Sequence, residues 1–170
     1  MEAVVSSAPE DALALTVKSI KSAKKKLNIN IYEMTSHEIS AAIISAVKRG
    51  VNVDILQEGQ PVGGVSKPGL EIQDDILTAM EESGGVHHYY EMSSKNDAKR
   101  RFVFDHAKYI LIDNEALLIG SENYSPTGQP KSGTKGNRGW EVLLDDADLI
   151  SDYLSVFKSD INMKFGDISQ

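Results

Sequence analysis

The stretch NINIYEMTSHEISAAIISAVKRGVNVDIL, residues 28–56, changes its apolar pattern twice. Its two ends, residues 28–34 and 51–56, are short apolar runs with the length of buried strands. Between them, four apolar residues recur at helical spacing: Ile39, Ile43, Ile44 and Val47. Ser36 is placed to cap this helix and Gly50 to end it. A strand, a helix and a strand in this order predict a βαβ unit with parallel strands.

Three further helices are predicted around this unit. The first covers residues 9–27 and carries apolar residues near helical spacing at Leu13, Val17, Ile20 and Leu27. The second covers residues 71–85 and ends on two glycines. The third covers residues 147–161 and is amphipathic. Helices on both sides of a βαβ unit are typical of α/β proteins.

Four more apolar runs are predicted as strands: residues 86–92, 101–113, 116–125 and 140–146. Asn114 and Glu115 separate the middle two, which indicates a tight hairpin. Residues 57–70 form a Gly- and Pro-rich loop at the carboxyl end of a strand, where open α/β sheets place ligands, so it is either a lid or a plain surface loop. Together, these helices and strands predict one α/β domain over residues 1–170, with a mixed central β-sheet flanked by helices.

The composition excludes several kinds of function. There are no cysteines, which rules out disulfides, thiolate zinc sites and cysteine nucleophiles. The formal net charge of -7 argues against a broad basic surface that coats nucleic acid. No stretch approaches the ~20 apolar residues of a membrane span, and residues 1–17 lack the pattern of a signal peptide. We therefore expect a soluble, cytoplasmic protein without a transmembrane segment.

Positive charge nevertheless gathers on both sides of residues 104–113. Four basic residues precede this segment, Lys95, Lys99, Arg100 and Arg101, and three follow it, Lys131, Lys135 and Arg138. Each cluster is either a solvated turn or a local patch for an anionic ligand.

Residues 104–113, FDHAKYILID, place polar side chains in an apolar strand. Because strand side chains alternate, His106 and Lys108 are expected to project from one face. A neutral imidazole can attack phosphorus, and an ammonium group can stabilise charge on phosphate oxygens without a metal. Asp113 is expected to point away unless the turn rotates it, and it either orients a neighbour or stabilises the turn. The segment predicts phosphoryl chemistry.

The other histidines give no metal site. His87 and His88 are neighbours on a predicted strand, so their side chains face opposite ways and cannot bind one ion together. His37 and Glu38, near a helix start, could bind an ion adventitiously. We expect no metal and no cofactor.

HAKYILID, residues 106–113, resembles the H-x-K-x-x-x-x-D motif of the phospholipase D superfamily, which adds Asp113 to the catalytic set. GSENYS, residues 120–125, follows at the distance that this family uses. Residues 22–56 also resemble the first half of such a domain. The resemblance covers most of the chain and implies a mixed α/β sandwich built on a central sheet.

The resemblance also implies roles for single residues. His106 would be either the nucleophile that forms a phosphohistidine or the acid that protonates the leaving oxygen. Lys108 and Asn123 would bind the phosphate oxygens, and Ser121 can add a hydroxyl donor from the same face as Asn123. Glu141 stands where the family often has an acidic residue hydrogen-bonded to the catalytic imidazole, which would fix its tautomer. An exposed edge position is the alternative for Glu141.

One departure from the family pattern bears on mechanism. The family mechanism uses two His-Lys sets, yet this chain has one. A two-fold homodimer would bring two copies of His106 to one phosphate, or the chain is one half of a tandem protein with a second phospholipase D-like half. We therefore expect a metal-independent phosphodiesterase that acts through a phosphohistidine, on nucleic acid in preference to phospholipid. The alternatives are a phospholipid hydrolase or transphosphatidylase half-domain, and a non-catalytic phosphate-binding module.

Overall fold

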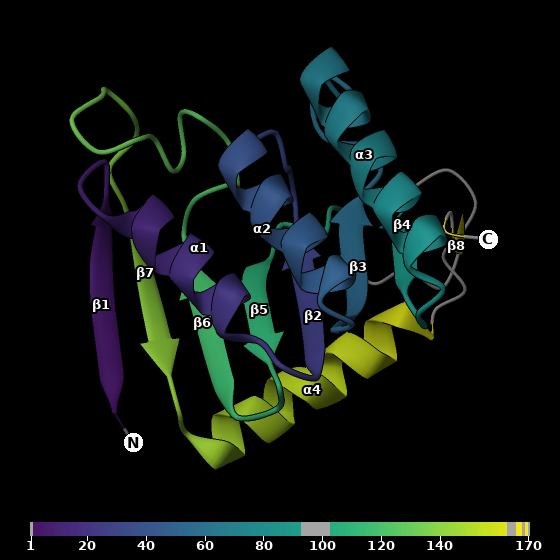
Figure 1. Cartoon of the computed structure of the whole chain (residues 1–170). Helices are drawn as coiled ribbons and strands as arrows, with labels where there is room; N and C mark the ends of the chain where they lie inside the picture. The colour runs from purple at the N-terminus through teal and green to yellow at the C-terminus, as the bar shows by residue number, and fades with distance from the viewer. Residues whose placement is uncertain (1, 93–102, 163–165, 168, 170) are drawn as a thin grey trace.

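The computed structural model describes residues 2–92, 103–162, 166–167 and 169 (Figure 1). In this part of the chain eight strands form one sheet, in the order β1-β7-β6-β5-β2-β3-β4-β8. The strands are β1 (Ala3–Ala8), β2 (Lys26–Ile31), β3 (Asn52–Glu58), β4 (His88–Met92), β5 (Lys108–Ile112), β6 (Ala116–Gly120), β7 (Gly139–Leu144) and β8 (Gly166–Asp167). The helices are α1 (Ala12–Ser22), α2 (His37–Lys48), α3 (Lys67–Ser83) and α4 (Ala147–Ile161).

The predicted βαβ unit is confirmed. β2 and β3 pair in parallel and are connected by α2, and β4 continues the parallel pairing on the other side of β3. The Ser36 hydroxyl accepts a hydrogen bond from the backbone N–H of Ile39, as expected of a helix cap. Gly50 has a φ of 83°, a left-handed conformation that glycine adopts without strain. The remaining pairs are antiparallel, so the sheet is mixed, as predicted.

Several predicted boundaries were wrong. α1 ends at Ser22, and Leu27 belongs to β2 rather than to the helix. α3 begins at Lys67, inside the predicted loop, because a proline in the first helical turn loses no hydrogen bond. β5 and β6 are shorter than predicted, and the turn between them has three residues, 113–115.

Two strands were not predicted, β1 and the two-residue strand β8. β1 lies at the edge of the sheet and pairs antiparallel with β7, with Ser6 opposite Glu141. Its partner strand, β7, is distant in the sequence, so no local sequence pattern indicated the pairing.

The sheet is covered by helices on both faces (Figure 1). α1, α2 and α3 pack on one face, around a core that includes Ile29, Ile43 and Ile110. α4 packs on the other face, where Phe157 and Ile150 meet Tyr109 and neighbouring residues. No helix in the described ranges is both long and apolar enough to span a bilayer.

The segments that contain the predicted site residues meet at one end of the strands, which we call the carboxyl edge of the parallel strands. The parallel strands β2, β3 and β4 end at this edge, and the antiparallel strand β5 begins there. β6 ends beside the start of β5, and β7 begins beside the end of β6. Residues 104–108, 120–125 and 137–141 therefore meet at the carboxyl edge of the parallel strands, where α/β sheets usually bind ligands.

Candidate functional site

His106 and Lys108 converge at this edge. Lys108 is the first residue of β5, and His106 precedes the strand rather than lying in it, which corrects the prediction. The Lys108 Nζ lies 3.1 Å from the His106 Nδ1 and donates a hydrogen bond of 2.7 Å to the His106 carbonyl oxygen. Lys108 is buried, whereas His106 is exposed. The pair is thus held together on one side and open to a ligand on the other.

The surroundings of the pair shift both pKa values. Burial, and then the positive charge of Lys108, lower the pKa of His106 below its ordinary value. Its imidazole is therefore neutral at neutral pH, the form that can act as a nucleophile. Burial also lowers the pKa of Lys108, although the carboxylates of Asp105 and Glu122 oppose this and favour the charged form.

Tyr32 forms a platform under the pair. Its ring centroid lies 4.6 Å from that of His106, and the Lys108 Nζ lies 5.4 Å from the same ring centroid, a distance typical of a cation–π contact. The Tyr32 hydroxyl accepts a hydrogen bond of 2.7 Å from the backbone N–H of Val62 in the loop that follows β3. Tyr32 was not predicted as a site residue, although an aromatic residue directly after a parallel strand was an available signal.

Asn123 and Ser121 lie just beyond the end of β6, beside the start of β5. The Asn123 Nδ2 donates a hydrogen bond of 3.1 Å to Glu33, which follows β2, and the buried Asn123 Oδ1 has no hydrogen-bond partner among the described residues. The exposed Ser121 hydroxyl accepts a hydrogen bond from the backbone N–H of Trp140. Both predicted phosphate ligands thus reach the edge that carries Lys108. Glu33 was not predicted.

Glu141 is completely buried, so the exposed edge position is wrong. Its Oε1 accepts a hydrogen bond of 2.7 Å from the Gln129 Nε2, which makes Gln129 rather than His106 its hydrogen-bond partner within the described chain. Burial raises the pKa of Glu141 to about 8, partly offset by Gln129. Gly120 lies opposite Glu141, and a Cβ there would collide with the carboxylate, so only glycine fits.

Asp113 lies apart from the His106–Lys108 pair. Asp113 follows the last residue of β5, whereas Lys108 begins that strand, so the two lie at opposite ends. The Asp113 carboxylate accepts backbone N–H groups of three successive residues, Lys24, Lys25 and Lys26, at 2.9, 2.7 and 2.8 Å. Of the two alternatives, the structure supports the one in which Asp113 stabilises the turn.

His87 and His88 are engaged in packing. The His87 Nδ1 accepts the backbone N–H of Val53, and its Nε2 lies 2.8 Å from the Ser83 hydroxyl. His88 stacks on Tyr90. Across the described ranges, no group of three or more histidine, aspartate or glutamate side chains is arranged to hold a metal ion.

Only the second of the two basic clusters lies within the described residues. Residues 95, 99, 100 and 101 lie outside the described residues. In the second cluster, Lys131 pairs with Glu38 at 2.6 Å and Arg138 pairs with Glu10 at 2.6 Å. Lys135 is exposed. Two of these three cations are thus partly neutralised by the chain's own carboxylates.

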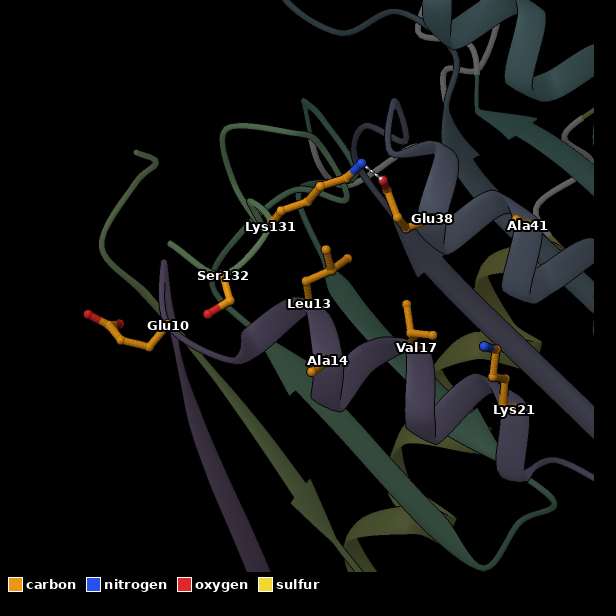
Figure 2. A pocket seen from close by; sticks show the side chains of 9 residues that line it. All are labelled: Glu10, Leu13, Ala14, Val17, Lys21, Glu38, Ala41, Lys131 and Ser132. Atoms are coloured by element: carbon orange, nitrogen blue, oxygen red, sulfur yellow. Dashed lines mark ion pairs between the residues drawn. The ribbon is translucent and has the colours of Figure 1, made fainter. Parts of the chain in front are cut away.

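An open groove of about 580 Å³ lies between α1 and α2 (Figure 2). Its floor is apolar, with Leu13 and Val17 from α1, and the Lys131–Glu38 ion pair stands at its rim. Neither His106 nor Lys108 lines this groove, so it is separate from the candidate site.

Comparisons with known proteins agree with this geometry. The family model "Cardiolipin synthase, PLD-like domain" matches residues 16–161. Cardiolipin synthase B of Escherichia coli strain K12 is 26% identical over 110 residues, which cover 64% of this chain and 25% of the synthase. The chain thus spans about a quarter of the length of this curated relative.

Two solved structures share the fold over nearly their whole length. The phospholipase D family member Nuc from Salmonella typhimurium superposes with a TM-score of 0.78 at 24% identity, covering 98% of this chain and 97% of Nuc. NucT from Helicobacter pylori gives a TM-score of 0.74 at 20% identity, covering 97% and 98% of the two chains.

Proposed function

Because this chain belongs to the phospholipase D superfamily, whose members act on phosphodiesters, we propose that it is a phosphodiesterase with His106 as its nucleophile. The observation that carries the proposal is the 3.1 Å approach of the Lys108 ammonium to an exposed, neutral His106 imidazole. A nucleophile and a cation at one point suit an attack on phosphorus without a metal.

The proposed reaction has two steps. A ring nitrogen of His106 attacks phosphorus, a P–N bond forms, and the P–O bond to the leaving group breaks while a second imidazole gives its proton to the departing oxygen. That imidazole then takes a proton from water, which attacks the phosphohistidine and releases a phosphomonoester. During both steps, phosphate oxygens replace the His106 Nδ1 as acceptors of the Lys108 donor, and Asn123 and Ser121 bind the remaining oxygens.

The second imidazole would come from a second copy of this chain. Among the described residues, His87 is tied into packing and no other histidine accompanies a lysine as His106 does. A two-fold dimer brings the same residue to the phosphate from both copies. A second phospholipase D-like half in a longer protein would supply the same group.

Nucleic acid is the proposed substrate. The single motif resembles that of small DNA-cleaving dimers, and the exposed Lys135 lies in the loop that precedes β7. Phospholipid is the second candidate, because the family model and the relative from E. coli are those of cardiolipin synthases.

The activity is tested with bis(4-nitrophenyl) phosphate in EDTA. We expect release of nitrophenol from the wild type and a loss of roughly 1,000-fold or more in His106→Ala. His37→Ala is the matched control, since His37 is exposed at the start of α2 and should keep full activity. A confirmed dimer that is inert would contradict the proposal and favour a non-catalytic phosphate-binding module.

The substrate is tested by offering plasmid DNA and phosphatidyl lipids to the same preparation. Cleavage of DNA that disappears in His106→Ala supports the preference for nucleic acid. Cleavage or transfer of lipid alone overturns that preference while leaving the mechanism intact.

A further inference from the structure

Two buried carboxyl groups lie at the candidate site and have no part in the proposed reaction. Glu58, the last residue of β3, is completely buried, and Asp105, directly before His106, is 5% exposed. β3 and β5 lie on either side of β2 (Figure 1), yet the end of β3 reaches the segment before β5. Burying an ionisable group costs free energy unless partners compensate it, so the partners of these two groups show what they do.

Glu58 joins two segments of the site through its two carboxyl oxygens. Its Oε2 accepts a hydrogen bond of 2.8 Å from the backbone N–H of Asp105, and its Oε1 accepts one of 3.0 Å from the backbone N–H of Gln60. Gln60 belongs to the loop after β3, which also donates a backbone hydrogen bond to the Tyr32 hydroxyl. One buried side chain thus ties this loop to the segment that carries the proposed nucleophile.

Asp105 holds the backbone on the other side of His106. Its Oδ1 accepts a hydrogen bond of 3.3 Å from the backbone N–H of Ala107, so its side chain reaches across His106. Aspartate side chains commonly form such turns with the residue two positions on. The His106 carbonyl oxygen in turn accepts a hydrogen bond of 2.7 Å from the Lys108 ammonium. The backbone is therefore held at three successive residues, with His106 in the middle.

The negative charge of Asp105 has a use beside Lys108. A neutral asparagine would accept the Ala107 N–H at a lower cost of burial, whereas burial raises the pKa of Asp105 to about 6. The second oxygen of Asp105 is buried near the Asn30 amide but makes no hydrogen bond of normal geometry within the described residues. Burial disfavours the ammonium form of Lys108, and the charge of Asp105 opposes this effect.

We propose that Glu58 and Asp105 are positioning residues for the reaction: they hold the backbone of His106 so that its imidazole stays beside the Lys108 ammonium. The inference rests on the proposed function and adds two residues that need not touch the substrate. Asp105 also supports the cation of Lys108. Such positioning matters to rate, because a misplacement of about 1 Å can slow a reaction roughly 100-fold.

Two variants of Asp105 separate the hydrogen bond from the charge. Asp105→Ala removes the Oδ1 acceptor, so kcat on bis(4-nitrophenyl) phosphate should fall roughly 10- to 100-fold, while KM stays within about 3-fold because the phosphate ligands are unchanged. Asp105→Asn keeps an acceptor oxygen and should restore kcat to within roughly 5-fold of the wild type. Asp152→Asn is the matched control, since Asp152 is exposed on α4 and should leave both constants unchanged.

The pH profile of kcat reads the effect of the charge. In Asp105→Asn the ammonium form of Lys108 loses support, so activity should disappear at a lower pH on the basic side than in the wild type. A merely structural Asp105 would leave this basic limb in place. The other titratable groups around Asp105 and Lys108 are kept in the variant: His106 before β5, Glu58 on β3, Tyr109 on β5, Glu122 after β6 and Asp160 on α4.

Titration of the histidines by NMR tests the placement of His106 without any substrate. Burial, and then the charge of Lys108, lower the pKa of His106 in the wild type, so a released imidazole should titrate at higher pH. We expect this rise in Asp105→Ala and not in Asp105→Asn. The His106 resonance is assigned by its absence in His106→Ala.

Glu58→Gln keeps the test valid if circular dichroism shows that Asp105→Ala is not folded. Glutamine has one acceptor oxygen for the two N–H groups that Glu58 binds, so kcat should fall at least roughly 3-fold and the His106 titration should move to higher pH. Wild-type kcat and an unmoved His106 titration in folded Glu58→Gln would overturn the role of Glu58.

The outcomes separate this inference from the proposed function. A wild type that hydrolyses no phosphodiester, with a His106 titration that rises in Asp105→Ala, contradicts the enzyme and supports the holding of His106. An active wild type overturns the inference and leaves the enzyme intact if folded Asp105→Ala keeps kcat within about 3-fold and does not move the His106 titration. A loss of kcat in Asp105→Asn as large as in Asp105→Ala, with an unmoved basic limb, also overturns the inference.

Discussion

Tyr32 packs against His106 and Lys108, the two side chains at the centre of the proposed site. Its ring contacts the His106 imidazole and the Lys108 ammonium, so losing the ring frees both. We expect Tyr32→Ala to lower kcat roughly 5- to 30-fold, which corresponds to about 1–2 kcal/mol of lost positioning. Tyr32→Phe keeps the ring face and should stay within roughly 3-fold of the wild type. The measurement is kcat on bis(4-nitrophenyl) phosphate.

The two tyrosine variants also separate the ring from the hydroxyl. Only the hydroxyl accepts the Val62 N–H and so ties the loop after β3 to the site. If Phe and Ala lower kcat equally, the loop tether matters and the platform does not. Wild-type kcat in Tyr32→Ala would dismiss both roles.

Glu141 should make stability depend on pH. Its pKa is raised from 4.5 to about 8 by burial, so between these values the folded state binds a proton that the unfolded state has lost. Stability is therefore greatest below the unfolded pKa and falls as pH rises toward 8, with a slope of up to about 1.4 kcal/mol per pH unit. Glu141→Gln, which cannot titrate, should flatten this slope in urea unfolding experiments. A slope that is equal in both proteins would show that Glu141 is not its source.

At the scale of single elements, Asp113 joins the β5–β6 turn to the start of β2. Three backbone N–H groups converge on its carboxylate, and its own φ of 54° lies in the left-handed region. We expect Asp113→Ala to lower the free energy of unfolding by about 2–3 kcal/mol, because these charge-assisted bonds are lost. kcat should stay within roughly 2-fold of the wild type, since the residue lies at the far end of β5 from Lys108.

Asp113→Asn is the graded control. Asparagine tolerates a positive φ and keeps one acceptor oxygen, so it should lose less stability than alanine. The pH dependence follows from the pKa. Partial burial raises the pKa, but the N–H groups of Lys26, Lys24 and Lys25 outweigh it and leave the pKa below 3.8. The stabilisation is thus present above the unfolded value and disappears as pH falls through the folded value. A large drop in kcat with unchanged stability would return Asp113 to the catalytic set.

The elements that sequence reasoning found are those whose signals are local. α2 carries its cap, its apolar stripe and its terminal glycine within one short segment, and all three were found. β1 has no such signal, because Val4 and Val5 are exposed and its partner β7 lies at the other end of the chain. α3 began earlier than predicted because Pro68 was taken as a loop residue, although a first helical turn accepts proline.

In the candidate site, too, contacts between neighbouring residues were predictable and contacts between distant segments were not. His106 and Lys108 are two residues apart, so their approach could be predicted from spacing. Glu33 and Gln129 could not be, since their contacts with Asn123 and Glu141 depend on how distant loops pack. The segment after β6 is anchored by a bridge between Met34 and Tyr124, which no local pattern shows.

At the scale of the whole molecule, helices cover one face of the sheet more completely than the other. Three helices cover one face of the sheet, while α4 leaves β1 and β7 bare on the second face. The site lies at the edge between these faces and contributes one His106 per chain.

A composite site predicts how mixtures behave. If each dimer holds one site built from two copies of His106, wild type equilibrated with an equal amount of His106→Ala should form wild-type dimers as only about a quarter of the total. Total activity should then fall to about half that of the same wild-type amount alone, because activity scales with the square of the wild-type fraction. If each chain carried a complete site, the added variant would leave total activity unchanged. The matched mixture uses His37→Ala, which should add activity in proportion to its amount.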